Sequence, residues 1–164
     1  MLKKIVLFAL LLLPLGVFAQ EKIAYFNLTE VYVIMPEFKQ MQDSLQKTQA
    51  AMEKELQVLQ EEYNKKYQSL MEEGEGLIES IKMRRLQDVQ SLEERINLFY
   101  EQSRQQLAQL QQALSEPIEK KINDAVQAVG ASNNFLYILR GEAISYISPN
   151  AIDATKLVQK YLKL

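Results

Sequence analysis

The stretch from Pro36 to Val129 constrains the fold of this 164-residue chain more than any other segment. After its first residue it contains no proline before Pro117, and its only glycines are Gly74 and Gly76. Most other positions hold Gln, Glu, Lys, Leu or Met, which all favour helices. The pattern predicts two very long helices that fold back on each other at these two glycines. Each arm should be roughly 55–75 Å long at 1.5 Å per residue. A compact domain needs no helices of this length, so we expect the function of the arms to depend on how far they project.

Both halves of this stretch carry an apolar stripe at helical spacing, which predicts that the helices pack along each other. The first stripe consists of Phe38, Met41, Leu45, Thr48, Met52, Leu56, Leu59 and Tyr63. The second stripe consists of Leu92, Ile96, Phe99, Ser103, Leu107, Leu110, Leu114, Ile118, Ile122, Val126 and Val129. Mean steps of roughly 3.6 and 3.7 residues favour a nearly straight antiparallel hairpin over a tight left-handed coiled coil.

A simple coiled-coil rod is the alternative interpretation of the two stripes. Past Leu59 the first stripe degrades, because Glu62 and Lys66 fall on expected seam positions. The apolar residues near the turn are also too many for one stripe. They are Tyr67, Leu70, Met71, Leu77, Ile78, Ile81, Met83 and Leu86.

Composition argues against an enzyme. The chain has no cysteine and no histidine, so it has no thiolate nucleophile, no disulfide and no imidazole base. Glu72, Glu73 and Glu75 cluster at the turn, where acidic side chains are usually solvated, and no base or nucleophile accompanies them. We therefore predict no catalytic residues, no cofactor and no metal site.

The N-terminus is typical of a secretory signal peptide over 1–19. Lys3 and Lys4 precede an apolar run over 5–18, and small residues stand at the −3 and −1 positions of a cleavage site after Ala19. A membrane anchor is the alternative, but the run is shorter than the ~20 residues of a spanning helix. The exported chain should begin near Gln20 and be soluble, without stable membrane insertion.

The exported chain is expected to be acidic. Loss of Lys3 and Lys4 changes its formal charge from −2 to −4, and the sequence pI is near 5.4. This balance argues against nucleic acid as a partner. Lys82, Arg84 and Arg85 form a basic cluster near the turn, for which a solvated helix face is the simplest interpretation.

Residues 20–35 are expected to begin a small body at the base of the arms. The aromatic and aliphatic run over 22–28 predicts a strand. Asn27 followed by Glu30 resembles a capping box and predicts a short helix. Pro36 should end that helix, because it lacks an N–H, and serve as the first residue of the long one.

The second arm should join the body near Pro117, which is expected to kink the helix or to mark where it leaves its partner. With a turn centred on Glu75, Pro36 lies opposite about residue 114. Residues 118–129 then have no partner arm and should pack on the body.

Residues 130–164 are expected to complete the body, with Gly130 as the helix C-cap. The predicted elements are strands over 135–139 and 143–147 and a last helix over 154–164, which Asp153 caps. The apolar side of that helix should consist of Leu157, Val158, Tyr161 and Leu162.

The three predicted strands make a small sheet with open edges, which self-association of several chains would cover. The fold class is therefore mainly α with a small β body, from which a long helical hairpin projects. The residues expected in the oligomeric body are Ile23, Tyr25, Phe26, Phe135, Tyr137, Leu139, Ile144 and Tyr146.

The order of these segments over nearly the whole exported chain resembles the Skp/OmpH family of periplasmic chaperones. The segments are the signal peptide, KIAYFN (22–27), PEFK (36–39), the Gln/Glu/Leu-rich hairpin, SEPI (115–118) and the final strand pair and helix. The resemblance implies a homotrimer whose hairpins surround a cavity, hold unfolded outer-membrane proteins and use no ATP. The lack of a glycine-rich phosphate loop agrees with that. The family's best-known members are strongly basic, so a lipopolysaccharide site is not carried over to this acidic chain.

Clients are expected to contact the arm tips, although packing within the hairpin is an equal alternative for each residue. The candidate contact residues are Tyr63, Tyr67, Leu70, Met71, Leu77, Ile78, Ile81, Met83 and Leu86. A structural spacer without client binding is the main competing hypothesis. A lipid-binding amphipathic helix is disfavoured, because the arms lack a strongly basic polar face.

Overall fold

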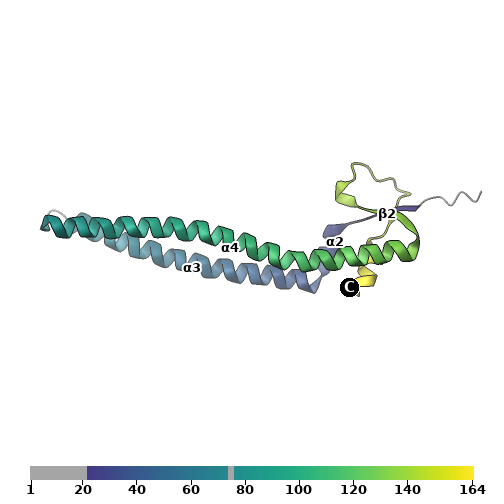
Figure 1. Cartoon of the computed structure of the whole chain (residues 1–164), viewed down its shortest axis with the longest axis horizontal. Coiled ribbons are helices and arrows are strands. Elements are labelled where there is room, and N and C mark those ends of the chain that lie inside the picture. Colours follow the sequence, from purple (N-terminus) through teal and green to yellow (C-terminus); the bar gives the residue numbers. More distant parts are fainter. Residues whose placement is uncertain (1–21, 74–75) are drawn as a thin grey trace, which may run out of the picture.

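The computed structural model describes residues 22–73 and 76–164, and it shows a long pair of helices attached to a small body (Figure 1). The elements are β1 (Lys22–Phe26), α2 (Leu28–Ile34), α3 (Pro36–Glu73), α4 (Glu79–Asn133), β2 (Phe135–Arg140), η2 (Gly141–Ala143), β3 (Ile152–Asp153) and α5 (Thr155–Leu162). The predicted combination of long helices and a small sheet is confirmed. The predicted signal peptide lies outside the described residues.

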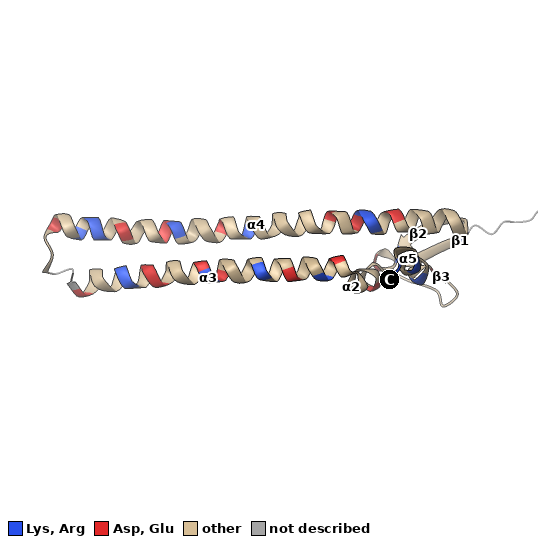
Figure 2. Cartoon of the chain, turned by 90° about the horizontal axis from the view of Figure 1, so that it is seen from below, with Lys and Arg blue, Asp and Glu red and all other residues tan. Residues whose placement is uncertain are grey.

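Helices α3 and α4 form the arms and lie side by side in both views (Figures 1 and 2). They contain 38 and 55 residues, which correspond to about 57 Å and 82 Å of helix. The part of α4 beyond Lys121, which pairs with Glu37 at the start of α3, extends past α3 and along the body. Ile122 and Val129 in this extension are buried in the core, as predicted, whereas Ile118, which was also expected to have no partner arm, faces α3 at the root of the arms.

The chain enters the first arm through the predicted caps. The Asn27 side chain accepts a hydrogen bond from the Glu30 backbone N–H at 3.1 Å and donates one to Glu30 Oε1 at 2.8 Å. These bonds satisfy a free donor at the start of α2. Met35 separates α2 from α3, and Pro36 is the first residue of α3, which confirms its predicted role.

The pairing of the arms differs from the prediction by about two helical turns. Glu37 at the start of α3 forms an ion pair with Lys121, so Pro36 does not lie opposite residue 114. The midpoint between Glu73 and the start of α4 at Glu79 is residue 76, one residue later than predicted, which moves the residue opposite Pro36 only from 114 to 116. The rest of the shift arises at the tip: counted back from the Glu37–Lys121 pair, Glu73 lies opposite about residue 85, so the first residues of α4 extend beyond the end of α3.

Pro117 does not end α4, which continues through it as a single helix. It lies one turn before Lys121, where α4 leaves its partner, so the second of its two predicted roles is supported. Pro117 is exposed, so water can reach the backbone carbonyl that loses its hydrogen bond there. Leu114 and Ile118 pack into the core and hold the helix together across this position.

The prediction that Gly130 caps α4 is wrong. The helix continues to Asn133, and Asn134 adopts the left-handed conformation (φ 54°, ψ 43°) with its backbone N–H bonded to the Gly130 carbonyl. Asn tolerates this conformation better than most residues. Gly130 lies within the helix beside Ile138, where a β-carbon would make an ordinary contact of 3.6 Å with Ile138 Cδ1, so the structure does not require glycine at this position.

The sheet has the order β2-β1-β3, and both pairings are parallel. The predicted strand over 143–147 is wrong, because the third strand is Ile152–Asp153. Parallel strands need a crossover connection, so the chain that leaves β2 must return along the sheet before it can pair with the other edge of β1. Residues 144–151 make that return.

Glu142 fixes the beginning of this return. Its Oε1 accepts a hydrogen bond from the Thr29 backbone N–H at 3.1 Å, which joins η2 to the first turn of α2. Burial raises the pKa of the Glu142 carboxyl, but hydrogen bonds to it outweigh this effect and hold the pKa below its ordinary value. The contact turns the chain away from the sheet where a further strand was expected.

One apolar core joins the body to the roots of both arms. It consists of Phe26, Val31, Met35, Met41, Ile118, Ile122, Ala125, Val129 and Val158. Helix α5 packs against it through Val158 and Leu162, whereas Leu157 and Tyr161 are exposed, so only half of the predicted apolar side is buried. Asp153 accepts a hydrogen bond from the Thr155 backbone N–H at 2.8 Å, but the helix begins at Thr155 and its N-cap is Ala154, so Asp153 is one residue before the capping position that was predicted for it.

We expect Ile122→Ala to lower the free energy of unfolding by about 2–5 kcal/mol, because Ile122 is only 1% exposed and its loss leaves a cavity. Urea unfolding followed by circular dichroism measures the change. Leu98→Ala on the same helix, where the side chain is 59% exposed, is the control and should change stability by no more than about 0.5 kcal/mol. Equal effects of the two substitutions would contradict this placement of the core.

Candidate functional site

The arms are the candidate site, and their seam is closed at both ends. Near the tip, Leu59, Leu70, Val89 and Leu92 are buried between α3 and α4. Near the body, Met41 and Ile118 are buried as well. Between these ends the seam residues are only partly buried. These are Leu45, Thr48, Met52 and Leu56 of α3, and Ile96, Phe99, Ser103, Leu107, Leu110 and Leu114 of α4.

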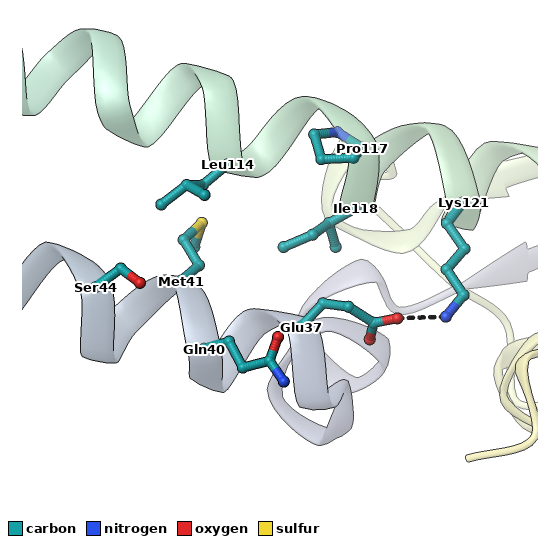
Figure 3. A pocket seen from close by; sticks show the side chains of 8 residues that line it. All are labelled: Glu37, Gln40, Met41, Ser44, Leu114, Pro117, Ile118 and Lys121. Carbon is teal, nitrogen blue, oxygen red and sulfur yellow. Dashed lines mark hydrogen bonds and ion pairs between the residues drawn. The ribbon is translucent and has the colours of Figure 1, made fainter.

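At the root of the arms, Glu37 and Lys121 join α3 to α4 across a groove of about 370 Å³ (Figure 3). Met41 and Leu114 approach each other at one end of the groove, and Ile118 points toward α3. The hydrogen bond from Lys121 holds the pKa of the Glu37 carboxyl below its ordinary value. This pair fixes the register of the arms where they meet the body.

Most of the candidate contact residues at the tip are exposed. Ile78, Met71 and Met83 are 70%, 59% and 50% exposed, and Tyr67, Ile81 and Leu86 are exposed as well. Tyr63 stacks on Tyr67 with ring centroids 5.9 Å apart, and Leu77 is half-buried. Leu70 differs, because it is buried in the seam and therefore contributes to hairpin packing.

Basic residues from both arms meet near the tip, although the sequence singled out only those of the second arm. Lys65 and Lys66 of α3 lie with Arg85 and Asp88 of α4 around a groove of about 330 Å³. Arg85 Nη1 donates a hydrogen bond to Ser69 Oγ at 3.0 Å and so ties the arms together at this end. Acidic and basic residues alternate along both arms (Figure 2), so neither arm has a face of one sign.

The middle of the arms contains a groove that the sequence did not identify. We call it the mid-arm groove, and its volume is about 320 Å³. It is lined by Gln49, Met52, Glu53 and Leu56 of α3 and by Phe99, Tyr100, Ser103, Arg104 and Leu107 of α4. Its only signal in the sequence is Ser103, a small polar residue on an apolar stripe.

The candidate body residues divide into buried and exposed groups. Phe26 is buried in the core of the chain, and Tyr25, Phe135 and Ile144 are half-buried. The exposed members are Ile23, Tyr137, Leu139 and Tyr146. Ile23 and Tyr137 are register partners on β1 and β2, so they form an exposed apolar pair on one face of the sheet.

The part of the chain that the structure describes contains no group of three or more acidic residues placed to hold a metal ion. Over the same ranges, 22–73 and 76–164, no helix has the length and apolarity that crossing a membrane requires.

Comparison with known proteins matches this architecture to one family. A family model described as outer membrane protein (OmpH-like) covers residues 22–162, which is almost the whole described chain. The chain belongs to the OmpH-like family. The resemblance predicted from the sequence is therefore confirmed.

Two relatives of this OmpH-like chain agree with that assignment. The chaperone protein Skp of Pectobacterium atrosepticum is 25% identical over 145 residues, which are 88% of this chain and 87% of that protein. The solved structure of an OmpH-like protein from Caulobacter crescentus CB15 matches with a TM-score of 0.75. It is 14% identical and covers 88% of this chain and 85% of its own, which shows a shared fold. Membership of this family supports a chaperone role, and not an enzymatic one, for the OmpH-like chain.

The Glu37–Lys121 pair predicts a pH-dependent stability. Glu37→Gln should lower the free energy of unfolding at pH 7 by at most about 1 kcal/mol, because both side chains are partly exposed. Since the folded-state pKa is lowered, the stabilisation is present above the ordinary value of 4.5 and is lost as the pH falls through the folded-state pKa. Urea unfolding of both proteins across this range measures the difference.

Lys121→Met is the matched control, because it removes the other partner of the pair. It should also lower the free energy of unfolding at pH 7, and this difference from wild type should likewise disappear at low pH. A difference between wild type and Glu37→Gln that stays constant below pH 4.5 would contradict the role of the pair.

Proposed function

We propose that this chain is an ATP-independent holdase of the periplasm that binds unfolded outer-membrane proteins between its arms and prevents their aggregation. One observation carries the proposal, namely the large apolar side chains exposed along the arms of an OmpH-like chain. Ile78, Met71 and Met83 are exposed at the tip. A structural spacer would not require exposed apolar side chains at this position. Exposed apolar clusters of this kind mark interaction sites.

The chemistry of these side chains suits a client that has no fixed shape. Methionine is flexible and polarisable, so it can adapt to different partners. Tyr63 and Tyr67 offer apolar rings with polar ends, which suits a surface that alternates between water and client. Many weak contacts on long arms can hold an unfolded chain and release it without a source of energy.

We further propose that the body assembles into a homotrimer, whose three hairpins enclose a cavity. Two features support this proposal. The outer edges of β2 and β3 are open in the described chain, and open edges pair readily with other strands. Ile23, Tyr137 and Tyr146 are exposed beside them and would be covered by neighbouring copies.

We expect the chain from Gln20 onward to suppress aggregation of a urea-unfolded outer-membrane β-barrel protein after dilution, without nucleotide. Light scattering at rising chaperone ratio measures this and should saturate near one oligomer per client. The triple variant Met71→Ser, Ile78→Ser, Met83→Ser should need several-fold more protein for the same effect, because it loses exposed apolar contacts and leaves buried Leu70 in place.

Tyr161→Ser, an exposed change in the body, is the control for the tip variant and should behave as wild type. If a folded wild-type oligomer fails to suppress aggregation even in several-fold excess, the structural spacer becomes the better hypothesis. If the tip variant is as effective as wild type, the tips are not contact sites.

We expect Tyr137→Asp to dissociate the oligomer, because a charge would be buried where copies meet while the exposed position leaves the core of the chain intact. Sedimentation velocity measures the oligomeric state, and circular dichroism checks the fold. Tyr100→Asp, at an exposed tyrosine on the arm, is the control and should sediment as wild type. Identical sedimentation of Tyr137→Asp and wild type would remove this face of the sheet from the interface.

A further inference from the structure

We infer that the mid-arm groove receives a large apolar side chain from an extended, uncharged segment of the unfolded client. This inference rests on the proposed function and places a specific subsite within it, in the middle of the arms and away from the tips.

The groove exists because small side chains occupy the centre of the seam. Ser103 of α4 stands on the apolar stripe where a leucine would fill the space between Met52 and Leu107. A hairpin optimised only for stability would bury its seam along the whole length, as it does at Leu59 and Leu92. The middle of the arms instead keeps apolar side chains accessible.

The ties between the arms lie on either side of this region. Glu37 and Lys121 connect α3 to α4 at the root, and Ser69 and Arg85 connect them near the tip. The polar pairs beside the groove have a different character, because each lies within one helix. Gln49 donates to Glu53 at 2.9 Å on α3, and Arg104 lies 3.8 Å from Glu101 on α4. Among the described residues, no side-chain hydrogen bond or ion pair joins the two arms beside the groove, in contrast to both ends.

The lining of the groove identifies the chemistry of its occupant. Met52, Leu56, Phe99 and Leu107 make an apolar floor, and about 320 Å³ is enough for one or two large side chains. The rim carries one acidic and one basic residue, Glu53 and Arg104, so charge complementarity favours a segment without net charge.

Two polar side chains of the groove suit an extended main chain. Gln49 beside the seam and Ser103 within it can each donate and accept hydrogen bonds, and an extended backbone offers both donors and acceptors along its length. An extended segment also turns alternate side chains toward the same surface, so one of them can enter the groove while its neighbours remain outside. A folded surface lacks such a protruding side chain with a free backbone beside it.

The decisive variant is Ser103→Leu, which fills the groove from within. It should raise the melting temperature by about 2–4 °C, because a void in the seam is filled. It should also weaken binding of a fluorescently labelled, urea-unfolded outer-membrane β-barrel protein by about fivefold or more, because the subsite is lost. If position 103 affected only the packing of the hairpin, the more stable variant would bind the client at least as well as wild type. Weaker client binding together with a higher melting temperature therefore supports the subsite.

Ser44→Leu is the matched control. It adds the same side chain at the root groove, which is similar in volume but is crossed by the Glu37–Lys121 pair. Binding by this variant should stay within about twofold of wild type. If both leucine variants bind as wild type, the groove is not a client subsite, while suppression of aggregation by wild type still upholds the holdase function. If wild type itself binds no client, both proposals fall.

A photo-crosslinking residue in place of Tyr100, which is 53% exposed on the groove wall, tests the same inference without filling the groove. Crosslinks to the labelled client, lost when Ser103→Leu is added, are expected. Crosslinks between copies of the chain in the absence of client would overturn the inference, because a second copy would then occupy the groove.

Discussion

The packing of residues 118–129 of α4 against the body is the constraint on which the rest of the structure depends. Ile122 and Ala125 lie within the core that α2, β1 and α5 share, and the same helix continues without interruption into the arm. The direction of the arm is therefore set by side-chain packing in the body. Helix α3 follows that direction, because its first turn is held to α4 by Glu37 and by Met41 in the same core.

The seam between the arms combines tightly packed ends with a partly buried middle. Leucine and valine close the seam near the tip, and Met41 and Ile118 close it near the body. Between them, the small side chain of Ser103 lies in a groove whose apolar side chains are only partly buried. Stability at the ends allows the middle to remain open without unfolding the hairpin.

Local signals made the helical part of the fold predictable from the sequence, whereas the sheet depended on distant contacts. The cap at Asn27, the helix start at Pro36 and the three- to four-residue spacing of the apolar stripes each depend on residues close in sequence. The structure has the elements that these signals predict. Residues 143–147 have a strand-like composition, but Glu142 and the parallel topology direct this segment elsewhere. The mid-arm groove was missed for the same reason, since periodicity in one helix does not show how well two stripes fill the space between them.

The central position of β1 has a consequence for the order of folding. Its pairing partners lie more than a hundred residues away, as Ile23 with Tyr137 and Tyr25 with Asp153 show. The hairpin can begin from contacts near its turn, such as Ser69 with Arg85, and extend toward the root, whereas the sheet closes only once the last segment of the chain is present. Ala24 and Phe26, both buried in the finished body, stay exposed until then. A chain cut short before β2 would therefore keep its arms and lack the base that orients them.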